Sequence, residues 1–178
     1  LTTVAGIPFY QGDTGSIYTH DVSGTDSTAT SNTAYGITAM DAITTGDSNS
    51  AFGFGALGAN TTGAHNTAVG RQALLANTTG VSNVAMGSDS LLTNTTGNYN
   101  TALGNQVLYN NTASYNTGLG QNALFTNTTG ANNTATGYKA LFANTTGASN
   151  TAVGDESLTA NTTASYNTAF GRRTLYAN

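Results

Sequence analysis

The sequence has no cysteine, a single proline and few charged residues. The lack of Cys excludes disulfides, thiolate metal sites and cysteine nucleophiles. Only 7% of the 178 residues are charged, against about 25% in ordinary globular domains, while Gly, Thr, Asn and Ala dominate. This composition is unlike that of helix-rich enzymes. Stability is therefore expected from packing, hydrogen-bonded ladders or oligomerisation.

Positive charge and long apolar runs are also scarce. Four bases (Arg71, Lys139, Arg172 and Arg173) stand against eight acids, and the formal net charge is −4. No basic face can form for a phosphate backbone, so nucleic acid is not an expected partner. No stretch approaches the roughly 20 apolar residues that cross a bilayer, and residues 1–10 lack the regions of a signal peptide. Membrane insertion is not expected, and we interpret the chain as a piece of a longer protein.

Repetition is the main feature of what is present. Asn recurs nine times with a spacing of 17 residues, or 16 residues between Asn100 and Asn116, and Gly follows each Asn four residues later. The copies share the motif N-T-A-x-G-x-x-A-L-x-x-N-T-T-G-x-x, as in residues 66–82. We number its positions 1 to 17 and call the residues at one position a column. The first column is Asn32, Asn49, Asn66, Asn83, Asn100, Asn116, Asn133, Asn150 and Asn167.

Four columns carry the structural expectation. Position 3 is small, which predicts a close-contact face that excludes larger side chains; it holds Ala34, Ala51, Ala68, Ala85, Ala102, Gly118, Ala135, Ala152 and Ala169. Positions 4 and 9 are apolar and are the predicted core. Position 4 holds Tyr35, Phe52, Val69, Met86, Leu103, Leu119, Thr136, Val153 and Phe170. Position 9 holds Met40, Leu57, Leu74, Leu91, Leu108, Leu124, Leu141, Leu158 and Leu175. Position 5 marks the turn with Gly36, Gly53, Gly70, Gly87, Gly104, Gly120, Gly137, Gly154 and Gly171.

The period and the residue types predict an all-β fold, a parallel β-solenoid (β-roll) of 17-residue coils. A helical repeat of this length would be too short, and Gly, Thr and Asn are poor in helix interiors. Short runs such as residues 66–69 alternate between two faces, and Gly and Asn-Thr-Thr-Gly punctuate the turns. Residues 32–178 are the predicted repeat array, with an incomplete last copy. Residues 1–31 fit the motif poorly, and their apolar segments 6–10 and 15–18 predict a cap or junction that covers the sheet edge.

The repeated motif resembles sequences of known fibrous proteins. Its N-T-A-x-G core is similar to the head repeats of YadA-like trimeric autotransporter adhesins, although the coil is longer here. The full motif looks even more like repeats of bacteriophage tail-fibre proteins, those of cyanophages included. The resemblance covers residues 32–178. It implies parallel β-rolls, three chains around a common axis, and a rod that presents or spaces receptor-binding parts.

The number of chains stays open on the residues themselves. The small column at position 3 is consistent with a seam between three chains, since small side chains let backbones approach. It suits a thin single-chain coil equally well. Positions 6 and 7 accept almost any residue, for example Arg71-Gln72 and Asp155-Glu156, which predicts an outward-facing turn.

No residue pattern indicates catalysis, a cofactor or a metal. His20 and His65 are far apart in the sequence and lack carboxylates at ligand spacing, so we expect surface histidines. Asp155 and Glu156 are adjacent, and adjacent residues of an extended segment point to opposite faces. No phosphate-binding or dinucleotide fingerprint is present, and the turns lack the Asp of calcium-binding repeats. We expect no enzyme, no cofactor and no metal site.

Two columns suggest other functions. The Asn of each N-T-T formally matches the glycosylation sequon, but a ladder role explains these residues without a glycan; they are Asn60, Asn77, Asn94, Asn127, Asn144 and Asn161. Threonine ranks at positions 2 and 13 resemble those of ice-binding solenoids. We expect the position-2 Thr, which shares a face with position 4, to be buried, which argues against an ice-binding face.

The function expected from the sequence is structural. The chain is predicted to be a tail-fibre or adhesin segment, in a virion or an extracellular appendage. It would act as a stiff homotrimeric spacer whose variable turns contact a glycan or protein of a host surface. The alternative is a self-assembling extracellular filament subunit, and the minor alternative is a threonine-face ice-binding solenoid.

Overall fold

The computed structural model describes residues 2–4, 7–11, 17–18 and 28–177. All regular elements in these ranges are strands, so the fold is all-β. The first three are β1 (Thr2–Val4), β2 (Ile7–Gln11) and β3 (Ile17–Tyr18). The repeat strands are β4 (Thr33–Tyr35), β5 (Ser50–Phe52), β6 (Thr67–Val69), β7 (Val84–Met86), β8 (Thr101–Leu103), β9 (Thr117–Leu119), β10 (Thr134–Thr136), β11 (Thr151–Val153) and β12 (Thr168–Phe170).

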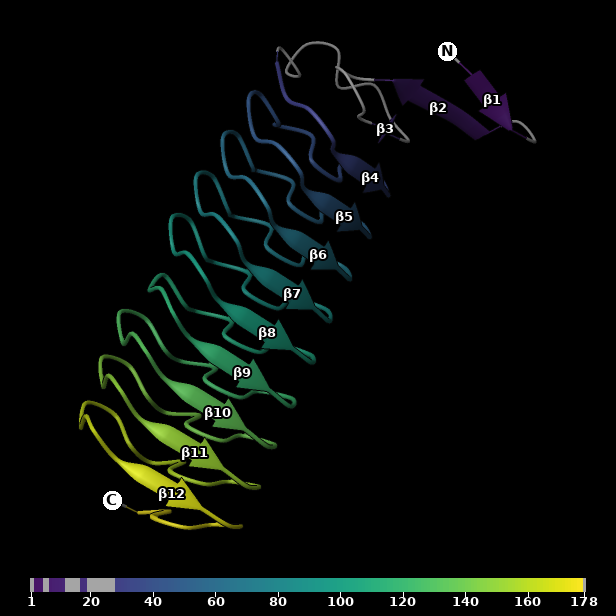
Figure 1. Ribbon diagram of the computed structural model, residues 1–178. Coiled ribbons are helices and arrows are strands. Elements are labelled where there is room, and N and C mark those ends of the chain that lie inside the picture. Colours follow the sequence, from purple (N-terminus) through teal and green to yellow (C-terminus); the bar gives the residue numbers. More distant parts are fainter. Residues whose placement is uncertain (1, 5–6, 12–16, 19–27, 178) are drawn as a thin grey trace.

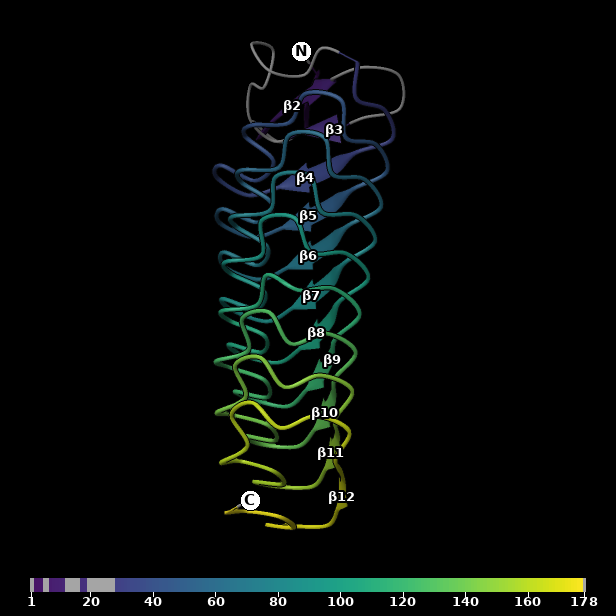
Figure 2. The same cartoon turned by 90° about the vertical axis from the view of Figure 1, so that its left-hand side faces the viewer.

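The nine strands β4 to β12 of the described residues form a parallel β-solenoid, as the repeat predicts (Figure 1). Each strand pairs in parallel with the strand of the next coil and in register with the motif. Ala51 lies opposite Ala68, for example, and Ala68 opposite Ala85. The strands stack in one column along one side of the rod (Figure 2). Because the register equals the repeat, every motif column becomes a row of neighbours along the rod.

The N-terminal strands extend this sheet. β1 pairs with β2 and β2 with β3 in antiparallel fashion, whereas β3 pairs in parallel with β4. The sheet edge at β4 is therefore occupied by β3. Of the expected cap or junction, residues 5–6, 12–16 and 19–27 lie outside the described residues.

Glycine follows each strand at position 5, and in most coils the backbone of the next coil lies too close for a side chain there. Gly70 has φ +133°, and a Cβ built on it would lie 2.6 Å from the carbonyl oxygen of Gly87. The positive φ and the lack of space both exclude other residues. Its N–H still joins the ladder, donating to the carbonyl of Phe52 at 2.8 Å.

The ladder continues around the coil beyond the strands. The N–H of Leu74 donates to the carbonyl of Ser90 in the next coil at 3.0 Å, and the N–H of Gln72 to Phe54 in the preceding one at 2.8 Å. These residues have φ values of +53° and +55°. Left-handed backbone is costly for residues with a Cβ. Here hydrogen bonds to both neighbouring coils and burial of Leu offset that cost.

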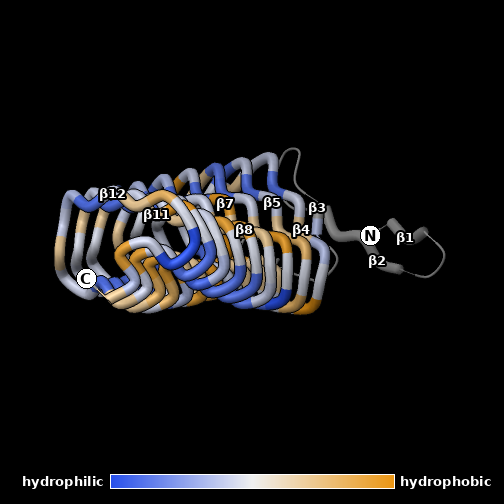
Figure 3. The backbone as a smooth tube through the Cα atoms, turned by 90° about the horizontal axis from the view of Figure 1, so that it is seen from below, coloured by the Kyte–Doolittle hydropathy of each residue, from blue (hydrophilic) through white to orange (hydrophobic). Residues whose placement is uncertain are grey.

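The core of each coil is narrow. It contains the position-3 Ala, a small residue at position 8 and the position-9 Leu, all buried. Burial of one Leu contributes about 1.5–3 kcal/mol, and the leucines stack from coil to coil. Buried members of the Leu column are Leu57, Leu74, Leu91, Leu108, Leu124, Leu141 and Leu158, whereas Leu175, in the last coil, is 42% exposed. Successive coils repeat the same outline and hydropathy pattern when the stack is viewed from its end (Figure 3).

The column at position 3 lies inside its own coil. Its members are at most 2% exposed where they are alanine, and Gly118 is buried as well. The close contact that restricts this position comes from the same chain. A Cβ on Gly118, for example, would lie 2.4 Å from Cγ1 of Val107. These residues offer no surface to a second chain.

The prediction that position 4 belongs to the core was wrong. Phe52 is 44% exposed and Phe170 66%, and the strands show a buried residue only at their centre. The Thr at position 2 points outward too, so the expected burial of this column was also wrong. Asn at position 1 and Ala at position 3 point inward, and strand alternation then turns positions 2 and 4 outward. The narrow interior has no room for the bulky residues of position 4.

Candidate functional site

The described residues contain no cluster of His, Asp and Glu that could hold a metal ion. His65 lies exposed on a turn, as expected for a surface histidine, and His20 falls outside the described residues. In the same ranges, no helix has the length and apolar character needed to cross a bilayer. The surfaces of the rod are therefore the candidates for function.

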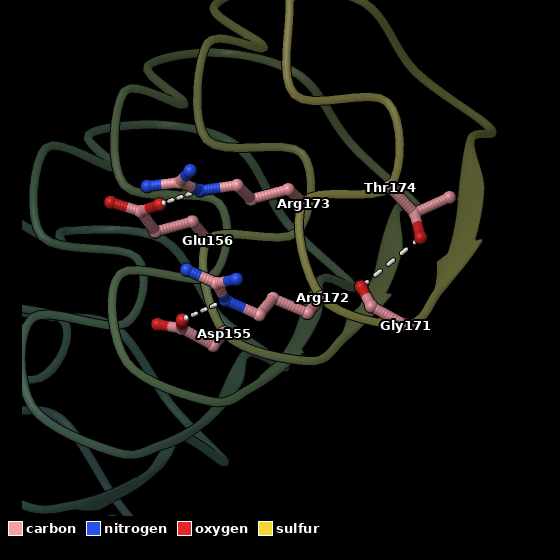
Figure 4. Close-up of polar contacts among 6 residues, drawn as sticks. All are labelled: Asp155, Glu156, Gly171, Arg172, Arg173 and Thr174. Carbon is pink, nitrogen blue, oxygen red and sulfur yellow. Dashed lines mark hydrogen bonds and ion pairs between the residues drawn. The ribbon is translucent and has the colours of Figure 1, made fainter.

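Charged residues on the turns are paired between neighbouring coils. In the last two coils, Arg172 Nε lies 3.1 Å from Asp155, and Arg173 Nε lies 2.5 Å from Glu156 (Figure 4). Glu156 raises the pKa of Arg173 through this contact. Asp155 and Glu156 thus bind separate arginines and do not form a carboxylate pair. Such exposed pairs contribute little to stability, because solvent screens the charges.

The first Asn column closes each coil from within. Asn66 Nδ2 donates to the carbonyl of Gly80 across the coil at 2.8 Å, and its Oδ1 accepts the N–H of Asn83 at 2.9 Å. Both polar ends are therefore satisfied in the interior, as a buried amide requires. The same two bonds recur along the stack, for instance at Asn49 and Asn133.

The Asn of each N-T-T forms a second buried ladder. Asn77 Nδ2 donates to Asn60 Oδ1 at 2.7 Å and to the carbonyl of Gly80 at 3.1 Å, and Asn94 Nδ2 donates in turn to Asn77 Oδ1. A glycan needs an exposed amide nitrogen. These side chains are 0–1% exposed, so their position in the fold disfavours glycan attachment.

The two threonine ranks differ in their hydrogen bonds. At position 13 the hydroxyl donates to the next coil, as Thr61 does to the carbonyl of Thr78 at 3.1 Å. At position 2 the hydroxyls form no hydrogen bond within the described residues and face solvent, for example those of Thr134 and Thr151. Of these two threonine columns, only the one at position 2 presents hydroxyls without a hydrogen bond in a row on a flat sheet.

We call the outward-facing positions 2 and 4 of β4 to β12 the outer sheet face. Position 4 puts large apolar side chains there: Tyr35 is 52% exposed, Phe52 44%, Met86 44%, Leu119 45% and Phe170 66%. None of the charged residues of the sequence stands at position 2 or position 4. An uncharged face that combines exposed large apolar side chains with threonine hydroxyls is typical of protein–protein interfaces.

A second apolar row lies at position 10, which the sequence reasoning missed. Its half-buried residues are consecutive through five coils, and they are Leu75, Leu92, Tyr109, Phe125 and Phe142. The rings of Tyr109 and Phe125 stack with centroids 5.0 Å apart, and those of Phe125 and Phe142 with centroids 5.4 Å apart. Stacking turns the ring faces toward each other, so this row mainly stabilises adjacent coils. Five apolar residues in one column were the available signal.

Asp47 holds the turn before the repeat's second coil. Its Oδ1 accepts the N–H of Thr30 at 2.6 Å and the hydroxyl of Thr30 at 2.9 Å. These bonds, the backbone one first, lower the pKa of Asp47 below its ordinary value, and His65 adds a smaller effect of the same sign. The side-chain oxygen of Asn98 likewise accepts the N–H of Val81, at 2.7 Å. A polar side chain at position 16 therefore accepts a backbone N–H from the preceding coil.

Comparisons of the chain with protein-family models, with curated proteins and with solved structures found no match. The geometry of the rod and its surfaces are therefore the observations that bear on function.

Proposed function

We propose that this chain is a structural fibre segment, of the tail-fibre or adhesin type, that acts as a stiff spacer in a virion or extracellular appendage. The observation that carries this proposal is the unbroken parallel register of β4 to β12. Every coil is bonded to the next through strands, turns and buried Asn. A stack of this kind resists bending and stretching because deformation has to break several hydrogen bonds at once.

The outer sheet face supports association of three chains in the fibre. It is free of charge along the whole stack, and its exposed apolar side chains at position 4 have no cover in a single chain. The variable residues at positions 6 and 7 lie on the turn beside it and remain available to a host glycan or protein. We therefore propose a seam at position 4, since the alanines at position 3 are buried.

Molar mass by light scattering, with negative-stain images of the same sample, tests this proposal. We expect a discrete species of three times the 17.9 kDa chain mass and short rods of uniform length. A monomer would contradict the association of three chains. Open-ended filaments would favour the alternative, an extracellular filament subunit that joins end to end.

A pair of variants locates the seam. Met86→Lys puts a charge on the outer sheet face, and Tyr138→Lys puts one at position 6, at an equal exposure of 44%. We expect Met86→Lys to dissociate the assembly and Tyr138→Lys to leave it intact. Equal masses for the two variants would show that the outer sheet face is not the seam.

One observation favours a second candidate, threonine-face ice binding. Position 2 is Thr in five consecutive coils, from Thr101 through Thr168, and these hydroxyls face solvent unbonded. The bulky neighbours at position 4 make this face less regular than an ice plane requires. Thermal hysteresis of the purified chain decides the matter: a freezing-point gap that Thr134→Tyr abolishes would support ice binding, and no gap would exclude it.

A further inference from the structure

The 16-residue coil differs from the other coils at one corner. It begins at Asn100. Its last segment, residues 111–115, has five residues, whereas the corresponding Asn-Thr-Thr-Gly-x-x segment of the other coils has six. This corner consists of residues 94–99 and the residues 111–115 that stack on them. We define these two segments as the short corner.

Three bonds that other coils make are absent between the two segments. Asn94 Oδ1 is buried and has no hydrogen-bond partner. Asn111 Nδ2 donates within its own coil, to the carbonyl of Ala113 at 2.8 Å, but makes no bond to Asn94, whereas Asn77 Nδ2 donates both within its own coil and to Asn60 Oδ1. In the preceding coil, the N–H and the hydroxyl of Thr78 both donate to the carbonyl of Thr95, at 2.9 and 3.0 Å. The N–H and the hydroxyl of Thr95 make no corresponding bonds to the coil that follows. The missing residue moves the carbonyl of Thr112 out of reach.

What remains across the short corner is a smaller set of contacts. Asn98 accepts the N–H of Tyr115 at 3.0 Å and donates its own N–H to the hydroxyl of Ser114 at 2.9 Å. On the outside, the rings of Tyr99 and Tyr115 stack with centroids 5.2 Å apart and an interplanar angle of 12°. Both tyrosines are more than half exposed and have φ values of +57° and +63°.

We infer that the short corner is a built-in hinge of the rod: it opens locally as a unit, and the Tyr99–Tyr115 stack is the latch that closes it. A buried carbonyl oxygen without a partner destabilises the closed state. Loss of two further bonds at Thr95 lowers the cost of opening, whereas the strands and the Leu column of the same coil are intact. This inference concerns a single chain and does not depend on how many chains associate.

Residue-resolved hydrogen exchange of the intact chain tests the hinge. The informative amide is that of Tyr115, which donates across the corner to the carbonyl of Asn98 at 3.0 Å and exchanges quickly only if the corner opens. The controls are Ser82 and Ser149, bonded at the same position of other coils at 3.0 Å, and Tyr99, which is bonded to Val81 across the regular corner before it at 3.1 Å. We expect the Tyr115 amide to exchange at least about tenfold faster than the controls. Equal protection would overturn the hinge, even if Thr95 alone exchanged quickly.

Two variants test the cause and the latch. Insertion of Gly between Ala113 and Ser114 restores a 17-residue coil and should slow exchange at Tyr115 to the rate of the controls. Tyr115→Ser removes the stack with a residue that other copies carry at this position, and should lower the protection of the amide of residue 115 further, relative to its intrinsic exchange rate. Its control is Tyr166→Ser, which breaks no stack among the described residues. The amides of residues 115 and 166 are both bonded to the preceding coil at 3.0 Å. If Tyr115→Ser lowered protection at residue 115 no more than Tyr166→Ser lowers it at residue 166, the latch would be excluded. If the insertion variant does not fold, the exchange profile of the unmodified chain decides.

Discussion

The coil that begins at Asn66 and the coil that begins at Asn100 are built from one motif but tolerate different changes. The Asn66 coil has the full 17 residues, Ala at position 8, and a next coil with Ala at position 3. The Asn100 coil is one residue shorter and has Val107 at position 8, while the next coil has Gly118 at position 3. Both keep their strand, their buried Leu and their place in the stack.

The difference shows which parts of a coil depend on one another. Val107 extends into the space that a Cβ of Gly118 would occupy, so the larger and the smaller residue compensate. The loss of a Cβ at Gly118 thus offsets part of the volume that Val107 adds, as close packing demands. The shorter corner is tolerated because it lies at a turn, where lost hydrogen bonds do not shift the strand register.

The largest effect is expected at the position-5 Gly of the regular coil. A Cβ on Gly70 meets the carbonyl oxygen of Gly87 at 2.6 Å, whereas a Cβ on Gly104 has no neighbour closer than 3.2 Å. Both have φ near +130°, so the strain of Ala in that conformation is common to both. We expect Gly70→Ala to lower the free energy of unfolding by about 4 kcal/mol or more and Gly104→Ala by about 1–3 kcal/mol. Urea denaturation measures both, and equal losses would refute the role of the inter-coil clash.

The leucine column should not distinguish the two coils. Leu74 and Leu108 are both fully buried, so truncation to Ala should cost about 2–5 kcal/mol in either coil. Chemical denaturation of Leu74→Ala and Leu108→Ala checks this. A much smaller loss of stability for Leu108→Ala would mean that the core of the short coil is loosely packed, and would contradict the equal burial of the two leucines.

Substitutions in the N-T-T Asn ladder should lower the stability of the two coils by different amounts. Asn77 makes three side-chain hydrogen bonds to buried partners, whereas Asn94 makes two and leaves its Oδ1 unpaired. We expect Asn77→Ala to destabilise by about 2–3 kcal/mol and Asn94→Ala by about half as much, because Asn94→Ala removes fewer hydrogen bonds and also removes a buried oxygen that has no partner. Thermal unfolding of the two variants measures the difference. An equal loss would contradict the broken ladder at Asn94.

Substitution of Gly118 should have a smaller effect on the free energy of unfolding, and a second substitution at Val107 should partly reverse it. Gly118→Ala alone should cost about 1–3 kcal/mol because its Cβ overlaps Val107. Val107→Ala in the same chain should recover part of this loss, because it restores the residues of the regular coil. A double-mutant cycle on unfolding free energies gives the coupling. Additive effects would show that the two positions do not share the space.

The smallest effect concerns pH at the start of the array. Since Thr30 lowers the pKa of Asp47 in the folded chain, the stabilisation is present above the unfolded-state pKa of about 3.9 and is lost as the pH falls through the folded-state value. Asp47→Asn keeps the hydrogen-bond acceptor and should flatten this part of the acid stability curve. Stability curves that fall in parallel below pH 4 would refute the contribution of Asp47.

Much of the fold could be predicted because the repeat is strict. Asn-to-Asn spacing defined the coil, and Gly and Thr excluded helices. The buried Leu column follows from its constant apolar identity. The outward direction of position 4 could not be predicted in this way. Strand alternation shows that positions 2 and 4 share a face, but not whether that face is the inner one. The apolar character of Phe52 and Met86 pointed to the wrong side.

By itself, the sequence determined the period, the parallel register and the small size of the interior, because identical residues can stack only when equal positions are neighbours. Only the tertiary structure decided which side chains point outward, how the chain turns between strands, and where a buried oxygen between neighbouring coils has no partner. A coil closed by inward-pointing Asn leaves room for Ala but not for Phe, which turns position 4 outward. The left-handed turns at Leu74 and Gln72 carry no Gly signal, since hydrogen bonds to the coils on either side hold them. The unpaired oxygen of Asn94 arises from the fit between two neighbouring coils, which no single copy of the motif contains.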